Sequence, residues 1–136
     1  MSKLGRYSAN RIKYQSVTDT TYTATAADCG TLFILNNSSG VAITLPDAIT
    51  AGAGWWATFT VDDVTADCTI TRATSGDTIV GAIGCPTDAV AGGVTVAATV
   101  VTFDQSGGAA IGDMVTIYCD GVGSTGTFRV TGTCAT

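Results

Sequence analysis

The segment from residue 29 to 61 constrains the fold most, because it holds three strand-like runs separated by turn residues. Residues 32–35 form an unbroken apolar run, which is typical of a strand covered on both faces. Residues 36–40 (Asn-Asn-Ser-Ser-Gly) favour a turn, since Asn and Gly tolerate positive φ and Ser bonds to nearby backbone. Residues 41–45 and 55–61 then alternate with a period of two. The segment predicts a sheet whose apolar faces the remaining chain must cover.

The composition predicts an all-β protein. The 136 residues fit one domain with a core of its own. The chain has 25 Thr, no Glu and no His, and Thr and Val favour strands over helices. Eight or nine short strands at regular spacing indicate an antiparallel β-sandwich or a barrel-like, jelly-roll-like domain. The further strand-like runs are residues 22–25, 68–72, 78–80, 94–103, 114–119 and 127–131.

Residues 1–20 show no clear period and are predicted to form an extended N-terminal arm before a single β-domain at residues 21–136. Beyond residue 13 the chain carries all 11 Asp and only two of the six basic residues. Such an acidic body does not suit nucleic-acid binding, where phosphates require a basic face. The arm either binds an acidic neighbouring protein or is a solvated, frayed terminus. Its four basic residues are Lys3, Arg6, Arg11 and Lys13.

The composition also excludes several kinds of catalytic site. Without His, Ser-His and Cys-His nucleophiles and His-based metal sites cannot form. Without Glu, paired-carboxylate chemistry falls to Asp alone. The acidic cluster at residues 62–67 lacks calcium-loop spacing and is typical of a solvated turn. Residues 121–126 match Gly-x-Gly-x-x-Gly but lead into a strand-like run, which favours a hairpin tip over a dinucleotide loop. We predict no enzyme activity, no cofactor and no metal.

The five Cys form no Cys-x-x-Cys pair, so a zinc or redox motif is unsupported. Residues 1–20 lack the apolar core of a secretory leader, and reduced thiols are therefore the expectation. Cys119 is in phase with Val115 and Ile117 and is predicted to be a small core residue. No run approaches the ~18 apolar residues that span a membrane. Residues 81–93 are the least regular stretch and predict a loop.

The pair Trp55 and Trp56 is the one unusual feature among the apolar residues. Adjacent strand residues face opposite sides, so one Trp is expected in the core and the other on the face shared with Thr58 and Thr60. An exposed Trp there indicates a subunit contact or a ligand platform, unless a second layer covers it. A protein interface is favoured over a ligand, because nothing nearby marks a sugar or nucleotide site.

Several stretches together carry a resemblance to a known family. They are Leu4-Gly5-Arg6-Tyr7-Ser8-Ala9-Asn10-Arg11, Thr25-Ala26-Ala27-Asp28-Cys29-Gly30, Ile43-Thr44-Leu45-Pro46 with Ala51-Gly52-Ala53-Gly54-Trp55-Trp56, and residues 110–121. Over most of its length the chain resembles the head decoration (cement) proteins of tailed bacteriophages, which are small β-domain virion proteins. Similar proteins often have a Trp or Tyr after the Asp-Gly turn, whereas here residues 123–126 intervene before Phe128.

The resemblance implies a structural protein on the capsid exterior of a virion, assembled in the host cytoplasm. Its implied partners are the major capsid protein and further copies of itself, often in a homotrimer, with no nucleic acid and no membrane. We expect the arm 1–20 and the loop 81–93 to make the contacts. The alternative is a tail or head fibre module that binds a host surface glycan through the outward Trp. The expected capsid or subunit contact residues are Lys3, Arg6, Tyr7, Arg11, Lys13 and Trp56.

Overall fold

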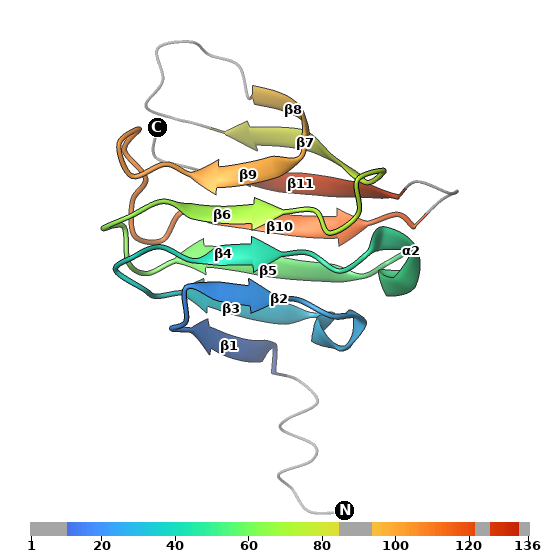
Figure 1. Cartoon of the computed structure of the whole chain (residues 1–136), viewed down its shortest axis with the longest axis horizontal. Coiled ribbons are helices and arrows are strands. Elements are labelled where there is room, and N and C mark those ends of the chain that lie inside the picture. Colours follow the sequence, from blue (N-terminus) through green and yellow to red (C-terminus); the bar gives the residue numbers. More distant parts are fainter. Residues whose placement is uncertain (1–10, 85–93, 122–125, 134–136) are drawn as a thin grey trace, which may run out of the picture.

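The computed structural model describes residues 11–84, 94–121 and 126–133, which form two stacked β-sheets (Figure 1). A short 3-10 helix, η1 (Ala26–Asp28), and one α-helical turn, α2 (Ala48–Ala51), lie between strands. The larger sheet has the order β1 (Lys13–Val17), β3 (Thr31–Leu35), β5 (Trp56–Val61), β10 (Met114–Cys119), β11 (Thr127–Thr133), β7 (Thr78–Gly84) and β8 (Val94–Ala98). The smaller sheet has the order β2 (Thr21–Thr23), β4 (Ala42–Thr44), β6 (Cys68–Thr71) and β9 (Val100–Phe103).

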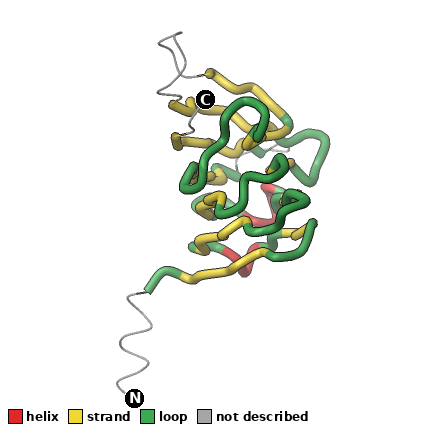
Figure 2. The backbone as a smooth tube through the Cα atoms, turned by 90° about the vertical axis from the view of Figure 1, so that its left-hand side faces the viewer, coloured by secondary structure: helices red, strands yellow, loops and turns green. Residues whose placement is uncertain are grey.

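From β1 to β6 the chain coils through the two sheets, taking one strand in the larger sheet and the next in the smaller one. Each return adds a strand beside the previous strand of that sheet, so β1, β3 and β5 are parallel, and so are β2, β4 and β6. Parallel neighbours need a crossover connection, and here the strand of the opposite sheet supplies it. Figure 2, turned by 90° from Figure 1, shows these successive turns one above another.

The second half of the chain closes the larger sheet differently. β7 returns to that sheet three places beyond β5, and the antiparallel pair β10 and β11 fills the gap between them. The all-β prediction is therefore confirmed, but both sheets are mixed rather than purely antiparallel. The arrangement is a two-layer stack of coiled turns, not the antiparallel sandwich or jelly roll that the strand spacing indicated. Period-two alternation is the same in parallel and antiparallel strands, which is why the sequence did not distinguish them.

The core lies between the two sheets and is built from their inward-facing side chains. Phe33 of β3 stacks on Phe59 of β5 with ring centroids 5.1 Å apart, and both are fully buried. Ile43 and Ile70 are register partners on the opposite sheet and are also buried. Cys119 is buried in phase with Val115 and Ile117, as its spacing predicted. Burying a large apolar side chain contributes about 1.5–3 kcal/mol each, so these layers supply most of the stabilisation.

Most predicted strands are present within a few residues of their expected bounds, with two informative differences. The run at 94–103 is divided at Thr99 into β8 of the larger sheet and β9 of the smaller sheet. Residues 13–17, expected in the arm, form β1 and pair in parallel with β3. The turn predicted at residues 36–40 is present, and Gly40 has φ +82° with no room for a Cβ, which would approach the Asp67 carbonyl oxygen to 2.2 Å.

Candidate interaction surfaces

The outward-facing side chains of the larger sheet form a broad surface, here called the outer face. The strand register places Leu32, Thr58 and Thr116 in one row across this face, and Trp56 beside Tyr118 in the next. Thr58 and Thr116 join their hydroxyl groups at 2.9 Å. Seven apolar side chains larger than Ala lie on the described part of the outer face, of which three are exposed and four half-buried. The exposed ones are Tyr14, Met114 and Tyr118, and the half-buried ones are Leu32, Ile34, Trp56 and Val80.

Trp55, directly before β5, and Trp56, its first residue, face opposite ways, as expected. Trp55 is 2% exposed, donates its Nε1–H to the Thr25 carbonyl at 3.1 Å and packs edge-on to Phe128. Trp56 is half-buried on the outer face with Thr58, and a Cβ on Gly30 would touch its ring at 3.7 Å. Trp55 therefore stabilises the core, whereas Trp56 is available for a partner.

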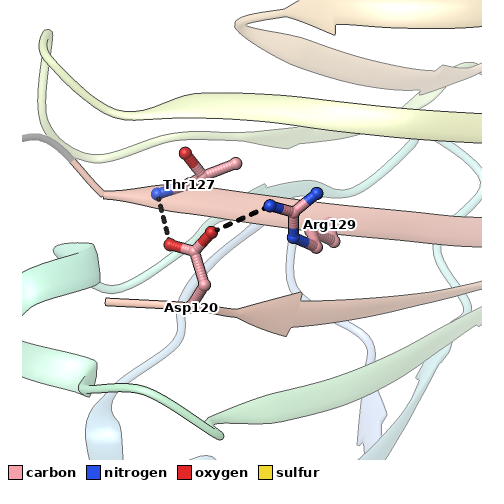
Figure 3. A network of polar contacts seen from close by, with 3 residues as sticks. All are labelled: Asp120, Thr127 and Arg129. Carbon is pink, nitrogen blue, oxygen red and sulfur yellow. Dashed lines mark hydrogen bonds and ion pairs between the residues drawn. The ribbon is translucent and has the colours of Figure 1, made fainter. Parts of the chain in front are cut away.

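The outer face carries one charged side chain in the part that the structure describes, Arg129 of β11. Arg129 forms an ion pair with Asp120 at 3.4 Å, and Asp120 also accepts the backbone N–H of Thr127 at 3.2 Å (Figure 3). The Arg129 side chain is 66% exposed, and an ion pair this exposed contributes little to stability. The strand register places Arg129 in the same row as Tyr118 and Trp56, near the start of β11.

The aspartates lie outside the strands. Every described Asp lies in a connection between strands, in η1 or at the N-cap of α2, and these segments lie at the two ends of the strands. One end, here called the acidic end, lies where β1, β3 and β5 finish, on the left of Figure 1. The other, the helix end, carries α2 and η1. The acidic end holds Asp19, Asp62, Asp63, Asp67, Asp104 and Asp113, and the helix end holds Asp28, Asp47, Asp77 and Asp120.

The described basic residues belong to the helix end. Arg11 is exposed and directly precedes β1, and Lys13 begins β1 and donates its Nζ to the Ala27 carbonyl at 3.0 Å. Arg72 follows β6 and donates to the carbonyl groups of Ser75 and Asp77. With Arg129, these four cations formally balance the four Asp of the helix end. The acidic end, over the same described residues, has six Asp and no cation.

The predicted contact residues are only partly brought together. Lys3, Arg6 and Tyr7 lie outside the described residues, as does most of the expected loop 81–93, whose first four residues belong to β7. Arg11 and Lys13 lie at the helix end, and Trp56 lies on the outer face. The sequence analysis missed Tyr118 and Met114. The signal for them was available, because residues that alternate with the buried Val115, Ile117 and Cys119 must face outward.

The described thiols and carboxylates do not form a recognisable reactive centre. Cys29, Cys68 and Cys119 are unpaired thiols, and burial raises the pKa of both Cys68 and Cys119. A buried thiol with a raised pKa is a poor nucleophile. Among the described residues no group of three or more Cys, Asp or Glu is placed to hold a metal ion. None of the described helices has the length and apolar character needed to cross a membrane.

Comparison with known proteins gives no relative: the chain matches no family model, and no curated protein or solved structure is significantly similar to it.

Proposed function

We propose that this chain is a structural virion protein that binds the exterior of a bacteriophage capsid and stabilises the lattice of its major capsid protein. The observation that carries the proposal is the outer face, which presents three aromatic side chains among threonines and is almost uncharged in a chain of formal charge −5. Interface cores are depleted of charge and enriched in Tyr, Trp, Met and Arg, and this face presents all four residue types among its threonines. The resemblance of the N-terminal, central and C-terminal stretches to decoration proteins supports the capsid as the setting.

The two parts of the chain then have separate tasks. The basic segment at Lys3, Arg6, Tyr7, Arg11 and Lys13 contacts the capsid, together with the loop at 81–93, and the outer face at Trp56 contacts other copies. A protein that binds only the assembled shell stabilises that state by mass action, and no catalytic group is required. The homotrimer that the resemblance implies stays a prediction here. We also retain the proposal that the chain is not an enzyme and needs no cofactor.

The first test is the copy number of the chain in purified virions, measured by quantitative mass spectrometry against the major capsid protein. Near-stoichiometric abundance supports decoration of the whole lattice. A few copies per particle would move the chain to a vertex or the tail, and absence from the particle would overturn the proposal.

The second test addresses the arm. A variant lacking residues 2–10 keeps Arg11 and the whole of β1, so its fold should be unchanged by circular dichroism. We expect it to lose occupancy on capsids stripped of the native protein. A Thr102→Asp variant, changed at an exposed position of the smaller sheet, serves as the control that should bind normally. Equal occupancy of the deletion variant and the full chain would contradict a role for the arm.

A host glycan is the second candidate partner, favoured by the register pairing of Trp56 with Tyr118 beside Arg129. Aromatic side chains offer flat apolar surface with a polar tip, and such surfaces suit partners that are themselves part apolar and part polar. Binding of purified protein to a panel of bacterial surface polysaccharides, lost on Tyr118→Ala, would favour this function over capsid decoration.

A further inference from the structure

We propose that two copies of this chain associate through their outer faces, with the acidic end of each copy lying over the helix end of the other. This contact concerns the free protein and does not depend on capsid binding. It differs from the homotrimer that the resemblance implies, and the two predict different masses in solution.

The first argument is the incomplete cover of β3. Its run at residues 32–35 is apolar at every position, a pattern typical of a strand buried on both faces. In the single chain Phe33 and Leu35 are buried in the core, whereas Leu32 and Ile34 stay half-buried on the outer face. Tyr14, the register partner of Leu32 on β1, is 67% exposed. A second layer over this face would bury the apolar side chains that the chain itself leaves open.

The size of the face sets how much of it such a contact must use. The seven strands of the larger sheet at about 4.8 Å spacing are about 29 Å wide, and strands of five or six residues are about 17–20 Å long. The projected area is therefore about 500–600 Å², against about 800 Å² of accessible surface per partner in a stable complex. A stable pair needs the whole face, including its central rows. A single charge placed near the centre should then disrupt it.

The charge distribution identifies the occupant and its orientation. The outer face has no Asp in its described strands, and the carboxylates lie at its two ends. The ends are about 17–20 Å apart, well beyond the screening length of about 8 Å at physiological salt. The charges at each end therefore interact mainly with the part of a partner that lies directly over that end. Like ends together would bring the six Asp of one copy near the six of the other, whereas unlike ends bring them over the helix end, where four cations offset the four Asp.

Only one two-fold arrangement packs the two outer faces together and also places unlike ends over each other. Two faces pack with unlike ends together when the two-fold axis lies between the sheets and perpendicular to the strands. An axis parallel to the strands would superpose the acidic ends. The helix end, where cations offset the aspartates, is the surface of this chain that repels the acidic end least, and a second copy supplies it. The outer face of the smaller sheet, lined by Thr, Ala and Val, lacks the aromatic side chains that a stable contact uses.

Sedimentation equilibrium of the full chain, at about 5–200 µM, tests the contact. We expect the mass of two copies. Thr131→Asp changes an exposed residue in the central row of the face and should raise the dissociation constant at least ~10-fold. Its matched control is Thr102→Asp, an exposed strand residue of the smaller sheet, which should dimerise as the parent does. Tyr118→Asp is a second interface variant should Thr131→Asp fail to fold.

Asp62→Lys tests the orientation by the sign of its effect. Asp62 is exposed at the acidic end directly after β5. With unlike ends together, the substitution should weaken association about five-fold, and adding Arg129→Glu should restore part of the loss. With like ends together, Asp62→Lys would instead strengthen it. A monomer throughout the concentration range, a trimer, or equal effects of Thr131→Asp and Thr102→Asp would each overturn the proposed contact.

Discussion

Replacing Asp77 should destabilise the fold more than replacing any exposed Asp. Asp77 is 1% exposed and its two carboxylate oxygens accept different backbone N–H groups. Oδ1 accepts from Gly126 at 3.0 Å and Oδ2 from Ala48 at 3.1 Å, both buried bonds. One side chain thereby joins the turn before β7 to the first residue of α2 and to the residue that precedes β11.

The magnitude follows from these two bonds. Asp77→Ala leaves both N–H groups buried without an acceptor, at about 1–3 kcal/mol each, so the free energy of unfolding should fall by about 2–6 kcal/mol. Asp77→Asn keeps one acceptor oxygen but turns an amide N–H₂ toward the other donor, so about half of that loss is expected. For a small domain of 5–15 kcal/mol, the Ala variant is close to the limit of folding.

Urea unfolding measured by tryptophan fluorescence would test this prediction, since Trp55 is buried in the core. At a slope of about 2 kcal/mol/M, the midpoint should fall by about 1–3 M for Asp77→Ala. Asp104→Ala is the control, because Asp104 likewise accepts from two groups, Ser106 and Gly107, but is exposed. Equal midpoints for the Asp77→Ala and Asp104→Ala variants would refute the argument that this carboxylate holds the helix end together.

Two further predictions concern titratable groups. Hydrogen bonds from Thr74 and Thr50 hold the pKa of Asp47 below its usual value, and bonds from Ser106 and Gly107 do the same for Asp104. A carboxyl group whose pKa is lower in the folded state stabilises the fold above its unfolded pKa, and this stability is lost as the pH falls through the folded pKa. Thr74→Val removes the main hydrogen bond to Asp47, so the thermal midpoint of this variant should decline less steeply below about pH 4. Burial raises the pKa of the Cys68 and Cys119 thiols, so iodoacetamide at pH 8 should label both far more slowly in the folded chain than in urea, as peptide mass spectrometry would show; equal rates would contradict their burial.

The sequence predicted well the features that depend on one strand at a time. The alternation of Trp55 and Trp56, the core position of Cys119 and the turn before Gly40 each follow from period two or turn chemistry, and each is present. Pairing direction depends instead on which strand lies alongside, and no local pattern records it. The short helix α2 was also missed. Asp47 caps it by accepting from Thr50 at 2.9 Å, and the chain's Thr-rich composition obscures so short a signal.

The candidate surfaces were predicted less completely. To predict them, each strand residue must be assigned to a face of its sheet and each turn to an end of the stack. The pattern around Trp56 identified the outer face, and the same reasoning applied to β10 would have added Met114 and Tyr118. Lys3, Arg6 and Tyr7 were chosen on charge and resemblance alone, and they lie outside the described residues. The sequence does not predict the position of Lys13. It lies on β1, which pairs with β3 through backbone hydrogen bonds, and residues 13–17 show no strand pattern.

To predict which end of the stack each Asp occupies, the number of strands before it must be known. Successive strands run in opposite directions through the stack, so each turn lies at the end opposite to the turn before it. A run at 94–103 read as one strand would assign Asp104 and Asp113 to the helix end and would hide the segregation. The bend at Thr99, whose carbonyl accepts the backbone N–H of Arg72 at 3.3 Å, divides that run in two and returns both carboxylates to the end that holds Asp62. One irregular residue therefore determines the charge polarity of the described residues, and with it the orientation that we propose for two copies.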